Sequence, residues 1–307
     1  MADPDLLAPG WRQSMRRVNG LDLHVVEAGE EGAPLLVLLH GFPEFWWAWR
    51  KQIGPLATAG YHVVVPDLRG YNTSDAPGGV ASYALDTLAD DVVALGAGYG
   101  VERFRLVGHD WGAVIAWWVA AMHAKRLERV VVMDGPHPDV WAAQALRHPT
   151  QALRSTYVAF FQLPWVPEAT LGAFDFAGLK TMMTASGKPD TFEPGALERY
   201  VEAWSRPGRL TAMLDYYRAL RERKARSEPA RLAPPTLILW AGDDRFLERH
   251  VAEAGLALCD DGRLEVVAGA THWLHLEQPE RVNAAILAFL ADGVGGGLSR
   301  ASPSGRH

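Results

Sequence analysis

The chain has 307 residues, of which 49% are hydrophobic and 21% are charged, so it can bury one large core carrying an insertion, or two cores. Its formal net charge of −6 gives no reason to expect nucleic acid or an anionic membrane as a partner. The single cysteine, Cys259, excludes an internal disulfide framework and a cysteine-based metal cluster.

The N-terminus lacks the features of an export signal. Acidic residues stand where a signal peptide would carry positive charge, and no apolar core follows them. The longest apolar stretch, 113–122, is much shorter than the about 20 residues that span a bilayer. We therefore expect a cytoplasmic protein. The sequence leaves its oligomeric state open, a homodimer included.

Strand-like and helix-like segments alternate through most of the chain. After an irregular leader and a first edge strand within 1–20, apolar or β-rich runs predict strands at 21–28, 34–39, 61–66, 103–107, 129–133, 236–240 and 264–267. Helix-like segments lie between them at 44–57, 87–98, 111–124 and 277–292. This order predicts an α/β fold with a mostly parallel, doubly wound sheet, in which sites form beyond the carboxyl ends of the strands.

The pattern changes between residues 136 and 230. Strand-like runs are missing there, and amphipathic helical stretches follow at 141–153, 196–205 and 210–223. We expect 136–230 to be a helical cap, inserted between a first core segment, 1–135, and a second core segment, 231–292, that the chain enters at Pro234 and Pro235. Residues 293–307, with a run of glycines and no apolar period, predict a disordered tail.

The chemistry centres on the segment Gly108-His109-Asp110-Trp111-Gly112, where a β-rich run ends and a helix-like run begins. A Gly-x-nucleophile-x-Gly turn presents its central side chain at the end of a strand. Serine is the usual residue there, and here it is Asp110. A carboxylate nucleophile leaves an ester, so its substrates are those from which an alkoxide or a halide departs, such as epoxides and alkyl halides.

A second turn follows the strand predicted at 34–39. In His40-Gly41-Phe42-Pro43, the glycine and the proline favour a turn that points the backbone N–H of Phe42 into a cavity. The N–H of Trp111, at the start of the helix after Asp110, is a second candidate donor. Two such donors form an oxyanion hole, which would stabilise the tetrahedral anion when water attacks an ester on Asp110.

A base and an acid complete the predicted site. His272 follows the last strand-like run, and Asp244 follows the strand at 236–240, so the chain order is nucleophile, acid, histidine. Asp243 is an adjacent alternative for the acid, and Asp134, at the end of the strand at 129–133, is another. His275 stands three residues after His272 without a carboxylate or third histidine to complete a metal site, so we expect no metal and no cofactor.

Taken together, these motifs resemble the α/β-hydrolase superfamily, specifically its epoxide hydrolases. The resemblance rests on His-Gly-Phe-Pro, Asp-Leu-Arg-Gly-Tyr at 67–71 followed by Ser74-Asp75, Gly-His-Asp-Trp-Gly and the late Thr-His-Trp, and it covers about residues 15–292. It implies a helical cap over an α/β-hydrolase core. It also implies that the small-molecule partners are an apolar epoxide and water, and that the product is a vicinal diol.

The resemblance also implies two cap tyrosines whose hydroxyls bind and then protonate the epoxide oxygen. Tyr157 matches the first of them, because it lies five residues before Gln162 as in the family. Tyr217 matches the second, with Tyr216 as a neighbour that could be confused with it.

Two kinds of dehalogenase share this nucleophile and are the nearest alternatives. Haloalkane dehalogenases resemble the chain at Trp111, whose indole N–H can hold a halide, but they usually carry asparagine where Phe42 stands. Fluoroacetate dehalogenases resemble it at Asp110 and Asp134, but they bind the substrate carboxylate with arginines where this chain has Trp111 and Val114. A non-catalytic receptor on this scaffold tends to lose a member of the site, whereas all members are present here.

Overall fold

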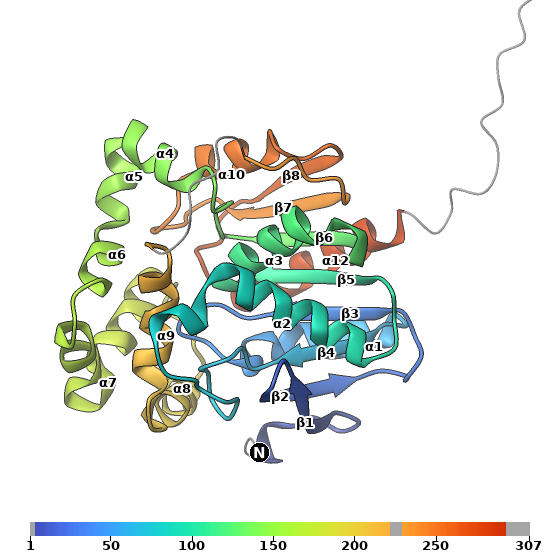
Figure 1. The fold of residues 1–307 in the computed structure, drawn as a ribbon, viewed down its shortest axis with the longest axis horizontal. Helices are drawn as coiled ribbons and strands as arrows, with labels where there is room; N and C mark the ends of the chain where they lie inside the picture. Colours follow the sequence, from blue (N-terminus) through green and yellow to red (C-terminus); the bar gives the residue numbers. More distant parts are fainter. Residues whose placement is uncertain (1–3, 222–228, 293–307) are drawn as a thin grey trace, which may run out of the picture.

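The computed structural model describes residues 4–221 and 229–292, and these form an eight-stranded sheet in the order β1-β2-β4-β3-β5-β6-β7-β8 (Figure 1). The strands are β1 (Arg12–Val18), β2 (Leu21–Ala28), β3 (Leu35–Leu39), β4 (His62–Pro66), β5 (Phe104–His109), β6 (Leu127–Met133), β7 (Thr236–Ala241) and β8 (Gly262–Val267). β2 pairs antiparallel with β1 and β4, and all other pairs are parallel. The predicted α/β fold with a mostly parallel sheet is confirmed.

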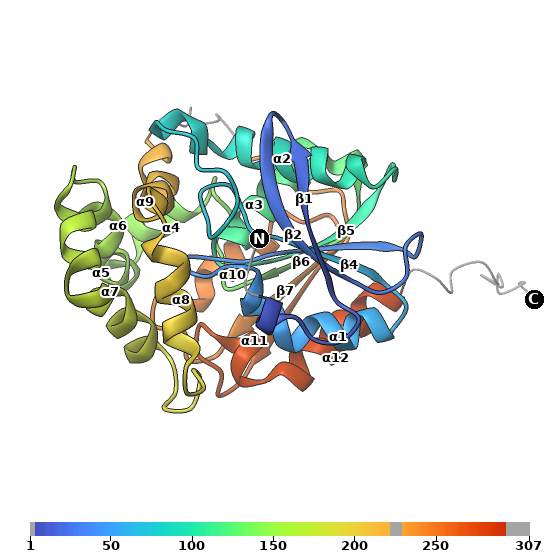
Figure 2. The same ribbon diagram turned by 90° about the horizontal axis from the view of Figure 1, so that it is seen from below.

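Helices cover both faces of the sheet, which explains why its central strands are apolar without alternation. α2 (Leu85–Gly98) and α3 (Trp111–Met122) lie on one face, and α1 (Arg50–Thr58) and α12 (Pro279–Ala291) lie on the other (Figure 2). Every residue of β3 is buried between these layers. α10 (Arg249–Leu256) packs beside β7 and β8.

A separate group of helices lies between β6 and β7 in the chain and beyond one end of the sheet in space (Figure 1). We call it the helical layer. Its members are α4 (Trp141–Arg147), α5 (Pro149–Arg154), α6 (Thr156–Phe161), α7 (Val166–Ser186), α8 (Ala196–Ser205) and α9 (Arg209–Ala219). The layer docks on the loops that follow β3 and β4, because Trp204 donates to the Pro43 carbonyl at 2.6 Å and Tyr216 to the Arg69 carbonyl at 2.8 Å.

The helical layer differs in detail from the sequence-based prediction. The stretch predicted as one helix at 141–153 is two helices, because Pro149 disfavours a helical conformation for His148, which is extended. The sequence pattern did not predict α7. Its backbone leaves the helical region around Phe174, Asp175 and Phe176, which have positive φ angles, so it joins two helical pieces at a kink.

No helix among residues 4–221 and 229–292 is both long enough and apolar enough to cross a membrane. The tail predicted to be disordered, 293–307, lies outside the described residues.

Candidate active site

Asp110 occupies a tight turn between β5 and α3. Its φ of 50° and ψ of −117° lie outside the regions that most side chains favour, as expected for a residue held at a functional turn. A Cβ on Gly108 would collide with the Gly112 carbonyl, and a Cβ on Gly112 would collide with the Leu39 carbonyl. Both glycines are therefore needed for the close packing that presents Asp110 at the carboxyl edge of the sheet.

The two oxygens of the Asp110 carboxylate face different partners. Oδ1 accepts a hydrogen bond from the Phe42 N–H at 2.8 Å, and Oδ2 lies 3.5 Å from His272 Nε2. A Cβ on Gly41 would lie 2.7 Å from Oδ1, so only glycine lets this loop approach the carboxylate so closely. The N–H of Trp111, the other predicted donor, belongs to the first turn of α3, where backbone N–H groups have no partner within the helix.

His272 is held from its other ring nitrogen by Asp244. His272 Nδ1 lies 2.8 Å from Asp244 Oδ2, and Asp244 Oδ1 accepts the backbone N–H groups of Phe246 at 2.6 Å and Leu247 at 3.0 Å. Burial alone would lower the pKa of His272, but the charge of Asp244 and the contact with Asp110 raise that pKa well above its usual value. The imidazole is thus bracketed by two carboxylates.

The other two aspartates considered as the acid have different surroundings. Asp243 is exposed. Asp134 is buried, and its Oδ1 accepts the Ala241 N–H at 2.8 Å, whereas its Oδ2 has no hydrogen-bond partner among the described residues. Burial, reinforced by the charge of Asp244, raises the pKa of Asp134 well above its usual value. The structure therefore places Asp244, and neither neighbour, in hydrogen-bond contact with His272.

The two predicted tyrosines come together above Asp110. Tyr157, from α6, and Tyr217, from α9, line one cavity with Asp110, and their ring centroids are 6.0 Å apart. Burial, with the nearby negative charges, raises the pKa of both hydroxyls, so each keeps its proton and can donate it in a hydrogen bond. The Tyr216 hydroxyl instead donates to the Arg69 carbonyl, so it serves packing within the fold.

The cavity has mainly apolar walls and two lobes, which share Asp110, Tyr157, Tyr217 and Phe246. The larger lobe is lined chiefly by Trp111, Val114, Pro136, Pro138, Trp141, Val158, Leu220, Phe246 and Leu247. The smaller lobe adds Phe42, Met182, His272 and Trp273. The described lining includes no lysine or arginine to bind a substrate carboxylate, and His272 already faces Asp244 and Asp110.

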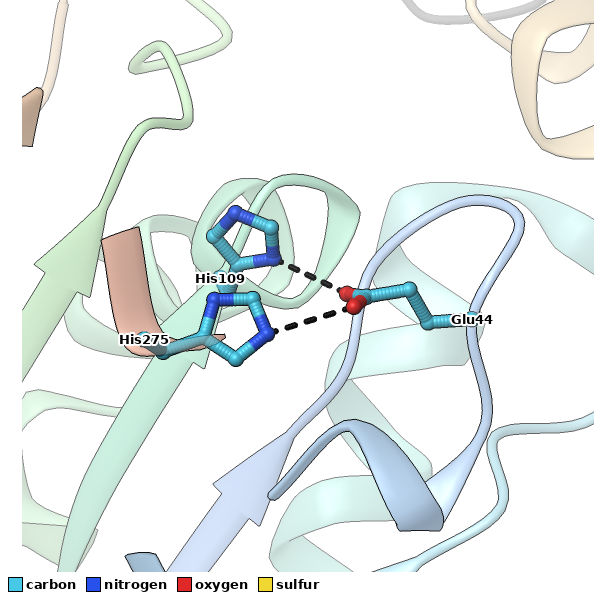
Figure 3. Close-up of side chains that lie close together, drawn as sticks. All are labelled: Glu44, His109 and His275. Atoms are coloured by element: carbon cyan, nitrogen blue, oxygen red, sulfur yellow. Dashed lines mark hydrogen bonds and ion pairs between the residues drawn. The ribbon is translucent and has the colours of Figure 1, made fainter. Parts of the chain in front are cut away.

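Three residues near the site were not recognised from the sequence. Glu44, His109 and His275 meet in a buried cluster, with their ligand-type atoms within 4.8 Å of one another (Figure 3). The sequence offered His275 only in combination with His272, whereas the structure joins His275 to Glu44 and His109. Spacing along the chain could not show this, because the three residues come from the loop after β3, the end of β5 and α11 (Leu274–Glu277). The sequence signal was only that Glu44 directly follows the motif His-Gly-Phe-Pro and that His109 lies within the motif Gly-His-Asp-Trp-Gly.

Comparisons with known proteins agree with this fold. A family model described as the alpha/beta hydrolase fold matches residues 34–279. The AB hydrolase superfamily protein YfhM of Bacillus subtilis is 44% identical, covering 89% of this chain and 95% of the relative. Epoxide hydrolase 4 of Mus musculus is 39% identical, covering 89% of this chain and 77% of the relative. The crystal structure of epoxide hydrolase A from Mycobacterium thermoresistibile is 31% identical, with a TM-score of 0.82 over 92% of this chain and 98% of the other.

The chain belongs to the epoxide hydrolases of the α/β-hydrolase superfamily. In this epoxide hydrolase family member, Asp110, Asp244 and His272 follow β5, β7 and β8, the order in which α/β-hydrolase folds supply nucleophile, acid and histidine. The family resemblance deduced from the motifs is confirmed.

Proposed function

We propose that the protein hydrolyses apolar epoxides to vicinal diols through a covalent ester on Asp110. The observation that carries this proposal is the environment of one carboxylate. Asp110 has the Phe42 N–H on one oxygen and His272 near the other, and it shares an apolar cavity with two protonated tyrosines. The names of the relatives support the same substrate class, since several are epoxide hydrolases.

In the first step, Asp110 attacks a carbon of the epoxide ring and the carbon–oxygen bond breaks. The epoxide oxygen leaves as an alkoxide, and Tyr157 and Tyr217 bind it and supply a proton. The helical layer acts in this step as a cap, because it contributes both tyrosines and much of the apolar wall. The result is a hydroxyalkyl ester on Asp110.

In the second step, His272 removes a proton from water, and the resulting hydroxide attacks the carbonyl carbon of the ester. The N–H groups of Phe42 and Trp111 stabilise the tetrahedral oxyanion. Its collapse breaks the ester C–O bond, and the departing diol oxygen takes the proton from His272. The Asp110 carboxyl then gives up its proton, which restores the tyrosine hydroxyl. Asp244 holds the imidazole with Nε2 toward the reacting atoms and stabilises its protonated form. Because the ester carries no negative charge, one of the groups that raise the pKa of His272 is lost in the intermediate, which favours the neutral base.

The cavity favours epoxides over the halogenated alternatives. Its described lining has no lysine or arginine for a haloacid, and Phe42 takes the place of a second side-chain donor for a halide. A point mutant of a related epoxide hydrolase from Bacillus megaterium, 29% identical, has been solved with its product (R)-3-[1]naphthyloxy-propane-1,2-diol, which is a vicinal diol with a large aromatic group. Apolar walls of the kind seen here suit a substituent of that kind.

A single-turnover reaction of excess enzyme with styrene oxide in ¹⁸O-water tests the proposal. The first turnover transfers an oxygen of Asp110 to the product, so we expect the diol's new oxygen to be largely ¹⁶O. A chloroalkane and fluoroacetate, run alongside, should release no halide. Halide release without diol would move the assignment to a dehalogenase, and fully ¹⁸O-labelled diol would exclude the ester intermediate.

A further inference from the structure

The first helices of the helical layer contact the loop that carries Asp244. This loop, residues 242–248, joins β7 to α10, and we call it the acid loop. α4 packs against α10, and α5 comes next in the chain (Figure 1). Side chains of α5 reach the backbone of the acid loop, as the next two paragraphs describe.

Gln151, on α5, is fully buried and holds the acid loop with its amide group. Its Nε2 donates to the Phe246 carbonyl at 2.9 Å and to the Ser155 hydroxyl at 3.0 Å. Its Oε1 accepts the Glu248 N–H at 2.8 Å. Both hydrogens of the amide are therefore used, and the loop is bonded through one donor and one acceptor of the same side chain.

Arg154, at the end of α5, is a second attachment. Its Nη1 donates to the Asp244 carbonyl at 2.7 Å, and its Nε lies 3.4 Å from the carboxylate of Glu248. The Thr150 hydroxyl donates to the same carboxylate at 3.0 Å. The backbone of residues 244, 246 and 248 is thus bonded to side chains of one short helix.

The same backbone orients the carboxylate of Asp244. Oδ1 accepts the N–H groups of Phe246 and Leu247, and Oδ2 lies 2.8 Å from His272 Nδ1. The Phe246 carbonyl and the Leu247 N–H belong to one planar peptide unit and point in opposite directions. The bond from Gln151 to that carbonyl therefore fixes the direction of the N–H that Asp244 receives.

We infer that α5 is a positioning element for the second step, in which Gln151, assisted by Arg154, holds the acid loop so that Asp244 stays aligned with His272. The inference rests on the proposed roles of Asp244 and His272. The helical layer thus serves both steps of the reaction. Its two tyrosines act in ring opening, and α5 aligns the acid for hydrolysis of the ester.

The pKa of His272 reports this alignment without any substrate. The charges of Asp244 and Asp110 raise that pKa, so a carboxylate of Asp244 that is less well aligned should raise it less. The other titratable groups near His272 are Asp134, Tyr157 and His109. A neutral substitution at residue 151 changes no charge, so any shift in the pKa of His272 comes from a change of position.

Gln151→Met removes both bonds to the acid loop and keeps a side chain of similar length. We expect the pKa of His272 in free enzyme to fall by about one pH unit. Hydrolysis of the ester should slow by about tenfold, whereas ring opening should stay within about twofold of the wild type. Gln162→Met is the matched control, because Gln162, at the end of α6, donates instead to the Tyr217 carbonyl at 2.9 Å. It should leave the pKa of His272 unchanged.

Nitrogen-15 NMR of the histidine side chains measures this pKa, with the His272 signal identified by its loss in His272→Gln. Mass spectrometry of the intact protein, mixed with styrene oxide, follows the ester. An unchanged pKa in Gln151→Met, or an equal fall in Gln162→Met, overturns the inference whatever the substrate proves to be. Slower ring opening with normal hydrolysis also overturns it. If the wild type forms no ester, the proposed function fails, and the NMR result still decides the inference.

Asp244→Asn shows whether Gln151 acts through Asp244. In that background, Gln151→Met should slow hydrolysis by less than about twofold more, and a further tenfold loss would overturn the inference. If Gln151→Met does not fold, Arg154→Met gives the same test at an exposed side chain. Loss of a positive charge by itself raises the pKa of His272, so a fall in this variant comes from position, and no fall overturns the inference.

Discussion

Asp244→Asn is the substitution for which the structure predicts the most specific kinetic outcome. The asparagine can keep the hydrogen bonds of Oδ1 to the N–H groups of Phe246 and Leu247, so the loop should hold its shape. At the position of Oδ2, 2.8 Å from His272 Nδ1, an amide N–H replaces a carboxylate oxygen. It can only donate, so it selects the imidazole tautomer with the hydrogen on Nε2, which cannot accept a proton from water.

The size of the effect follows from two contributions. The fully buried carboxylate of Asp244 acts on the imidazolium across about 4 Å, which corresponds to about 4 kcal/mol at an effective dielectric constant of about 20, or about a 10³-fold change in rate. The wrong tautomer adds to this, and the same exchange in a serine-type triad lowers kcat by about 10⁴-fold. We therefore expect hydrolysis of the ester to slow by about 10³- to 10⁴-fold.

Ring opening should be affected far less, because it depends on Asp110 and the tyrosines. Mass spectrometry of the intact protein after mixing with styrene oxide should therefore show the ester accumulating on the variant. Turnover within about tenfold of the wild type would refute the reasoning. If turnover persists, adding Asp134→Asn shows whether Asp134 has replaced Asp244 as the partner of His272. Asp134 lies near His272, and its Oδ2 has no hydrogen-bond partner among the described residues.

Three further predictions concern the cap, the pH dependence and the stability of the core. Tyr157→Phe and Tyr217→Phe should each slow ring opening by about 10²-fold, and the double variant should abolish it, as measured by single-turnover kinetics. Ring opening turns the Asp110 carboxylate into an uncharged ester, which removes one of the charges that raise the pKa of His272. We therefore expect kcat to be lost as pH falls through a pKa that is lower than the pKa of His272 measured by NMR in free enzyme. Arg69→Met should lower the free energy of unfolding in urea by about 3–5 kcal/mol, because it leaves the buried Asp91 unpaired.

Each of these three predictions has an outcome that would contradict it, and the stability prediction also has a control variant. Near-normal turnover by the double tyrosine variant would exclude the cap hydroxyls from the reaction. A kcat profile with its acid limb at or above the pKa of free His272 would contradict the account of the intermediate. Arg263→Met removes an exposed pair with Asp292 and should change stability by less than about 1 kcal/mol. An equal loss in both arginine variants would show that burial of the Asp91 pair has no special effect.

Local sequence determined the framework of the site. The glycines around Asp110 are required by close contacts within the turn and with β3, and Gly41 is required because its loop passes close to Asp110. Each motif could therefore be recognised from a few neighbouring residues. The order of apolar strands and helices follows from periodicity, which depends on neighbouring residues. For the same reason, the sequence alone predicts that Asp110, the turn at Phe42 and the loop of His272 lie at the carboxyl edge of the sheet.

Only the tertiary structure decided between candidates that are adjacent or equivalent in the chain. Asp244 is hydrogen-bonded to His272 whereas Asp134 is bonded to the Ala241 N–H, and Tyr217 faces the cavity whereas the Tyr216 hydroxyl donates to the Arg69 carbonyl. These choices depend on how each loop and helix is rotated by packing against distant segments, as where Tyr216 meets Arg69, 147 residues away in the chain. A single sequence carries no local signal for such contacts. The cluster of Glu44, His109 and His275 is the clearest case, since its members join only when the loop after β3, the end of β5 and α11 meet.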